Sequence, residues 1–138
     1  MSKQFTLGKN ERLKSRKSIE QLFSEGNSFV TSPYRIHFKF NKNESPGKNS
    51  LLQFGVGVSQ KHFKKAVDRN RIKRLTREAY RLQKVLLQEM LKEKNIELHV
   101  FFNYTGKELP VFQHISEKVA VALNKLSKLI NENSTPDP

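Results

Sequence analysis

The sequence predicts an α+β fold in which helices pack on a small mixed sheet. Residues 34–40, 51–59 and 96–103 alternate apolar and polar side chains with the period of two that is typical of strands. Residues 67–94 and 110–129 instead repeat apolar side chains every three or four positions, as amphipathic helices do. With a shorter helix before the first strand, the order is α-β-β-α-β-α, which is typical of an α+β sandwich.

The shorter helix is predicted over residues 16–24. Ser15 precedes it as a candidate N-cap, because a serine hydroxyl can accept hydrogen bonds from the N–H groups of the first turn. Gly26 follows it as a typical C-terminal stop. Residues 1–12 are basic and polar, and we expect them to form a partly ordered N-terminal arm.

The first two strands, 34–40 and 51–59, each have one apolar face. Paired as a hairpin, they would present a second face that is basic, polar and open. Gly55 and Gly57 lie on that second face, where the lack of side chains suits close approach by another chain. Residues 41–50 contain Asn, Ser, Pro and Gly without periodicity and are expected to form a loop.

Length and charge limit the possible functions. The 138 residues suggest one domain, residues 1–138, with residues 131–138 as a flexible tail. The net charge is +13, and residues 61–84 alone hold ten Lys and Arg against two acids. Such a field attracts polyanions. Nucleic acid is the first candidate, and an anionic membrane or an acidic protein is the alternative.

Two absences from the sequence narrow the location and the chemistry. No cysteine is present, so disulfides and thiolate metal sites are excluded, and a reducing cytoplasm is the expected compartment. No apolar run approaches the roughly 18–20 residues of a membrane span. The sequence therefore predicts no membrane-spanning segment, and the partner we expect is nucleic acid and not a membrane.

The predicted helix 67–94 separates charge from apolar side chains. At about 100° per residue, its cations and one Asn fall on one stripe, opposite an apolar face. The stripe comprises Asn70, Lys73, Arg74, Arg77, Arg81 and Lys84, and the apolar face Ile72, Leu75, Ala79, Leu82, Leu86 and Met90. Only Asp68 and Glu78 lie nearby as acids, so we expect the stripe to stay unpaired and to meet an anionic partner.

The start of this helix is predicted to bind phosphate. Arg69, Asn70 and Arg71 lie in its opening turn, where free N–H groups and the helix dipole favour anions. Each guanidinium can also bind a phosphate through two parallel hydrogen bonds. The loop before the helix adds three cations that can follow a phosphate backbone, Lys61, Lys64 and Lys65. For Arg81 and Lys84, a role in solubility alone stays open.

Ile19, Phe23 and His37 are candidates for a partly apolar floor on which unpaired bases stack. Ordinary core packing is the alternative for Phe23. The four histidines lack metal-ligand spacing, and neither a paired-carboxylate nor a Ser-His-Asp arrangement is visible. The sequence thus predicts a binding protein without a metal site or catalytic residues of its own.

Residues 66–77, with the sequence AVDRNRIKRLTR, resemble the protein component of bacterial ribonuclease P. The run Arg69-Asn70-Arg71-Ile72-Lys73-Arg74-x-x-Arg77 is similar to the signature of that family. Residues 55–61, GVGVSQK, resemble the strand and turn that precede the signature. The resemblance covers roughly residues 13–129.

The resemblance implies a protein subunit that binds a catalytic RNA and the 5′ leader of precursor tRNA. It implies that the RNA carries out the Mg²⁺-dependent endonucleolytic removal of the leader and holds most of the Mg²⁺. We expect one protein per RNA, in the cytoplasm. The family fold is ribosomal-protein-like, with a left-handed β-α-β crossover. The alternative is a structural ribosomal-type RNA-binding protein without a processing role.

The resemblance and the charge pattern together assign two surfaces. The surface for the catalytic RNA comprises Lys61, Lys64, Lys65, Arg69, Asn70, Arg71, Lys73, Arg74, Arg77 and Arg81. The cleft for the leader comprises Ile19, Phe23, Arg35, His37, Lys39 and Gln60. The sequence departs from the family pattern at Ile19, where an aromatic residue is usual, and at Gln60, which replaces a lysine.

Overall fold

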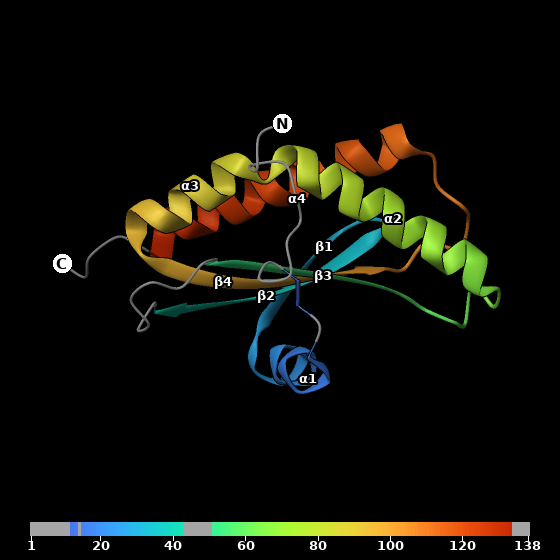
Figure 1. Ribbon diagram of the computed structural model, residues 1–138, viewed down its shortest axis with the longest axis horizontal. Helices are drawn as coiled ribbons and strands as arrows, with labels where there is room; N and C mark the ends of the chain where they lie inside the picture. The colour runs from blue at the N-terminus through green and yellow to red at the C-terminus, as the bar shows by residue number, and fades with distance from the viewer. Residues whose placement is uncertain (1–11, 14, 43–50, 134–138) are drawn as a thin grey trace.

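The computed structural model describes residues 12–13, 15–42 and 51–133. They form a four-stranded sheet with one helix on one face and three helices on the other (Figure 1). The elements are α1 (Arg16–Glu25), β1 (Asn27–Thr31), β2 (Tyr34–Lys42), β3 (Leu52–Val58), α2 (Ala66–Gln83), α3 (Val85–Lys94), β4 (Ile96–Tyr104) and α4 (Phe112–Asn133). The predicted α+β class, with a mixed sheet, is confirmed.

The strands are arranged in the order β1-β2-β4-β3, with β2 antiparallel and β3 parallel to β4. The predicted hairpin between β2 and β3 is therefore wrong, because β4 lies between them. Strand β4 carries the run Val100-Phe101-Phe102, which is buried on both faces of the sheet. A strand that is apolar on both faces belongs in the interior of a sheet, where both of its faces are covered.

Strand β1 was missed by the sequence analysis. It lies at the edge of the sheet, antiparallel to β2, and a cis peptide bond between Ser32 and Pro33 lies in the turn that joins the two strands. Phe29 is the only one of its five residues that is buried. A short strand with one apolar anchor has too little alternation to be distinguished from a loop.

The main core lies between the sheet and helices α2, α3 and α4. The apolar residues predicted for one face of β2, β3 and β4 are buried or half-buried there. Two contacts fix α2 on the sheet: the ring of Tyr80 stacks on Phe54 at 3.8 Å between centroids, and the hydroxyls of Tyr34 and Thr76 form a 2.6 Å hydrogen bond. Helix α4 packs beside α2 through its predicted apolar residues, Ile115, Val119, Ala122, Leu126 and Leu129.

The single helix predicted over residues 67–94 is two helices, α2 and α3, which meet at Lys84. Lys84 is 1% exposed, so its placement on the basic stripe is wrong. The buried face of the helix is also rotated relative to the predicted apolar face. Leu82 and Leu86 are 48% and 64% exposed, while Thr76 and Tyr80 are buried. The stack of Tyr80 on Phe54 sets this rotation, which a helical wheel drawn from the sequence cannot show.

The other face of the sheet carries a second, smaller core. Phe101 packs there with Leu13, Leu22 and Ile19. A Cβ atom on Gly55 or on Gly57 would lie only 2.8 Å from the Phe101 ring. The two glycines therefore make room for a ring of the same chain, and their predicted role in contact with another chain stays a prediction.

Several predicted segments lie partly or wholly outside the described residues. Of the N-terminal arm, Arg12 forms a parallel bridge with Phe54, and residues 1–11 are outside. Residues 43–50 of the predicted loop are also outside. Helix α4 begins at Phe112, not at Pro110, and continues to Asn133 through the start of the predicted tail. In the described ranges no helix is long and apolar enough to cross a bilayer.

We expect Thr76→Val to lower the free energy of unfolding by about 1–3 kcal/mol, because the buried Tyr34 hydroxyl loses its partner. Chemical denaturation measures this loss. The control is Thr76→Val combined with Tyr34→Phe, which removes both hydroxyls and should recover part of the stability. A double variant less stable than Thr76→Val would show that the hydrogen bond does not fix α2 on the sheet.

Candidate nucleic-acid interface

Arg69, which is predicted to contact RNA, also anchors the first turn of α2. The Arg69 guanidinium donates hydrogen bonds from Nη1 to the carbonyl oxygens of Phe63 at 2.7 Å and Lys64 at 2.9 Å. These bonds hold the loop that joins β3 to α2 against the start of the helix. Arg69 therefore positions the loop that carries the exposed side chains of Lys64 and Lys65.

Beyond Arg69, the predicted stripe is largely exposed. Asn70, Arg71, Arg74 and Arg77 are open to solvent, and Lys73 is half-buried. Arg81 is paired with Glu78, with 2.5 Å between Nη2 and Oε1. The prediction of an unpaired stripe is therefore wrong at Arg81, because residues three apart on a helix are neighbours on its surface. The cationic surface of α2 is concentrated over residues 70–77.

A cavity of about 510 Å³ lies along the edge strand β3, between α2 on the first face of the sheet and α1 on the second. It is lined by Arg12, Leu13, Ile19, residues 54–58 of β3, Lys73, Arg77 and Phe101. Although much of the Arg77 side chain is exposed, partial desolvation and then the neighbouring Arg12 lower its pKa. The two guanidinium groups repel one another at the cavity wall. An anion between them would relieve this repulsion. The cavity therefore combines anion-binding walls with an apolar floor.

The structure brings Lys73 and Arg77 to this cavity together with Ile19, although the sequence analysis assigned them to different surfaces. Arg12 was missed altogether, since its place depends on the bridge to Phe54 that no local pattern reveals. Phe101 was missed as well. Its signal in the sequence is the apolar run Val100-Phe101-Phe102, which breaks the alternation of β4.

Beside the cavity, three rings form an aromatic patch, defined here as Phe23, His37 and Phe101. The Phe23 ring lies 4.4 Å from the ring of His37 and 5.3 Å from that of Phe101, between centroids. Phe23 is 46% exposed, so ordinary core packing does not describe it. Because Phe101 also lines the cavity, the patch and the cavity are continuous. An unpaired base could stack on this patch.

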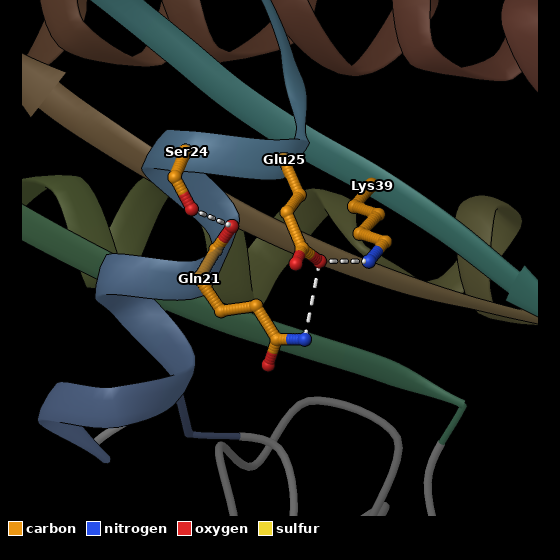
Figure 2. Close-up of polar contacts among 4 residues, drawn as sticks. All are labelled: Gln21, Ser24, Glu25 and Lys39. Carbon is orange, nitrogen blue, oxygen red and sulfur yellow. Dashed lines mark hydrogen bonds and ion pairs between the residues drawn. The ribbon is translucent and has the colours of Figure 1, made fainter.

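Arg35, His37 and Lys39 project from β2 on the side that faces α1, as their alternation predicts. Arg35 is exposed and its guanidinium contacts the Ser28 hydroxyl at 3.5 Å. Burial, and to a lesser degree the charge of Arg35, lower the pKa of His37. Lys39 is paired with Glu25, with 2.8 Å between Nζ and Oε2 (Figure 2). The second face of the sheet is thus partly covered by α1 and is less open than predicted.

The remaining predicted residues lie in the connection between β3 and α2. Gln60 and Lys61 are exposed in the turn after β3, where the Lys61 backbone N–H donates to the Ser59 hydroxyl at 3.1 Å. Among the residues that the structure describes, no three His, Cys, Asp or Glu side chains gather where they could hold a metal ion. The site offers cations, amide groups and rings.

Comparison with known proteins places the chain in a family. The family model for ribonuclease P matches residues 7–127. The ribonuclease P protein component of Porphyromonas gingivalis is 38% identical over 123 residues, which cover 89% of this chain and 88% of that protein. The protein of the same name from Chlorobium phaeobacteroides is 28% identical over 128 residues, 88% of each chain.

Solved structures agree in fold. The RNase P protein of Staphylococcus aureus superposes with a TM-score of 0.63 at 19% identity, covering 87% of this chain and 97% of that one. At this identity the likeness supports the fold alone. The match of the family model over most of the sequence is the stronger finding, and it includes both α2 and the residues that line the cavity. The chain belongs to the ribonuclease P protein component family.

Proposed function

We propose that this chain is the protein subunit of a ribonucleoprotein that removes the 5′ leader of precursor tRNA in the cytoplasm. The observation that carries the proposal is the continuity of two cationic surfaces. The exposed stripe of α2 meets the cavity at Lys73 and Arg77, and the cavity continues into the aromatic patch. One chain thus has a convex surface and a concave surface for RNA, joined at one edge.

The two surfaces suit different kinds of RNA. An exposed helical stripe of cations can contact the phosphates of a folded RNA from outside, without access to its bases. A cleft with an exposed ring suits unpaired nucleotides, whose bases can stack. We therefore assign residues 70–77 of α2 mainly to the catalytic RNA, and the cavity with the aromatic patch to the leader. Lys73 and Arg77 lie where the two RNAs would meet.

We further propose that the RNA subunit carries out the hydrolysis and holds most of the Mg²⁺, with one protein per RNA. Mg²⁺ prefers carboxylate, phosphate and water oxygens. The described part of this interface presents mainly positive side chains, which would repel a free cation and attract phosphate. A structural ribosomal-type protein would share the charge of α2. Co-purification with a ribosomal particle, in place of one RNA of a few hundred nucleotides, would favour that alternative.

Adding the full chain to a cognate catalytic RNA should stimulate cleavage of precursor tRNA at low Mg²⁺ concentration. The physical reason is that protein cations offset phosphate repulsion that Mg²⁺ would otherwise have to screen. The measurement is the cleavage rate of end-labelled precursor tRNA across a Mg²⁺ titration. No stimulation at any Mg²⁺ concentration would refute the proposed function.

A matched pair of variants localises the effect in the same assay. Arg71→Gln removes an exposed cation of α2, and Lys92→Gln removes an exposed cation of α3. Arg71→Gln should weaken binding of the catalytic RNA and reduce the slope of log affinity against log salt by about one. Lys92→Gln should leave both unchanged. Equal losses from the two variants would indicate that only total charge matters.

His37 should titrate below its ordinary value of 6.5 in the free protein, because burial and then Arg35 disfavour its charged form. The unfolded chain then takes up the proton first as the pH falls below about 6.5, so His37 should lower stability in acid. A bound leader phosphate should raise this pKa. The measurement is an NMR titration of the His37 ring.

Two variants check the causes of that shift. Arg35→Gln should raise the pKa of His37, since it removes the neighbouring positive charge. Arg16→Gln removes an exposed charge from α1 and should leave the pKa unchanged. A pKa of His37 at or above 6.5 in the free protein would contradict this reading of the aromatic patch.

A further inference from the structure

The basic side chains on the α1-facing side of β2 differ in their contacts. Arg35, His37 and Lys39 follow one another at every second residue, a spacing of roughly 7 Å along the strand. Arg35 contacts a neutral hydroxyl, and His37 contacts the Phe23 ring. Lys39 instead has a carboxylate, Glu25, at 2.8 Å. An anionic strand that runs along β2 would therefore meet an arginine beside a neutral hydroxyl, then a histidine beside an aromatic ring, and then a lysine with its own counter-ion.

Glu25 is held at Lys39 by the end of α1. The Gln21 amide donates to the same carboxylate oxygen, Oε2, at 3.1 Å, and the Ser24 hydroxyl donates to the Gln21 carbonyl at 3.2 Å (Figure 2). Gly26 then ends the helix against β2, where a Cβ atom would lie 2.8 Å from the Phe38 carbonyl oxygen. The bonds from Lys39 and Gln21 lower the pKa of Glu25, so the carboxylate is ionised at neutral pH.

The neighbouring strand also places a carboxylate beside a basic side chain at this level. In the register of the sheet, His99 of β4 lies opposite Lys39, and its Nε2 is 2.5 Å from Oε1 of the buried Glu97. Closer to the cavity, the residues opposite Arg35 and His37 are Asn103 and Phe101, which are uncharged. Carboxylates therefore enter this face between His37 and Lys39, where Glu25 and Glu97 lie beside Lys39 and His99.

We propose that Glu25 ends the path of single-stranded RNA on β2, by occupying the position at Lys39 that a further phosphate would otherwise take. This inference rests on the proposed function, because the strand concerned is the leader. A phosphate that approached Lys39 would be repelled by the carboxylate and would have to displace an ion pair that Gln21 supports. The leader gains contacts at Arg35 and His37 and none beyond. Glu25 thus limits the number of leader nucleotides that contact the protein.

The test uses the reconstituted complex of protein and catalytic RNA, with precursor tRNAs whose leaders grow by one nucleotide at a time. For the unsubstituted chain, the affinity should rise with leader length and then reach a plateau. Glu25→Gln keeps the side-chain shape and removes the charge, so Lys39 can bind a phosphate. The plateau should move to a longer leader, and the salt dependence for the longest leaders should steepen by about 0.7.

Two further variants separate this local effect from total charge. Glu20→Gln removes the same charge from the same helix, where Glu20 is exposed and lies 3.8 Å from Arg16, and it should leave the plateau unchanged. Glu25→Gln combined with Lys39→Gln should return the plateau to its original length. Equal shifts from Glu20→Gln and Glu25→Gln would overturn the inference, as would an unchanged plateau in Glu25→Gln.

The outcomes also distinguish this inference from the proposed function. If the protein stimulates cleavage but affinity is independent of leader length, the role of Glu25 is refuted and the subunit function stands. If the protein gives no stimulation, the subunit function fails and the inference fails with it.

Discussion

The parallel pairing of β3 with β4 is the constraint on which the interface depends. Neighbouring parallel strands cannot be joined by a tight turn and need a crossover connection, which α2 and α3 supply. Helix α2 follows β3 after a short loop, so its basic first turns are fixed beside the end of that strand. The stack of Phe54 on Tyr80 sets its rotation. Lys73 and Arg77 reach the cavity because of this placement.

One face of the sheet packs the main core, and the other face carries part of the proposed binding site. Helices α2, α3 and α4 cover the first face and form the main core with it. On the second face, α1 covers only part of the sheet and is held by a small cluster around Phe101. Phe101 therefore has two roles, since it anchors α1 and also forms a wall of the cavity. The glycines of β3 leave room for its ring against the backbone of that strand.

Local patterns in the sequence identified most helices and strands. The features that they missed depend on tertiary contacts. Alternation located β2, β3 and β4, because each has a regular apolar face, but it could not order them. The helical periodicity of residues 67–94 placed the cations of α2 on one stripe, but it wrongly included Lys84, which lies at the break between two helices. The prediction for Arg81 took Glu78 into account but expected no pairing, whereas the two side chains, three residues apart, form an ion pair. Arg12 and Phe101 belong to the site through long-range contacts, which spacing along the chain does not encode.

The central claim is that two joined surfaces of one small protein bind two different RNAs. The most direct measurement is photo-crosslinking of the assembled complex, with reactive nucleotides placed either in the leader or in the catalytic RNA. Leader nucleotides should label peptides of α1, β2 and β3, and the catalytic RNA should label residues 70–77 of α2. Leader crosslinks confined to the exposed side of α2, or catalytic-RNA crosslinks confined to α1 and β2, would contradict the central claim.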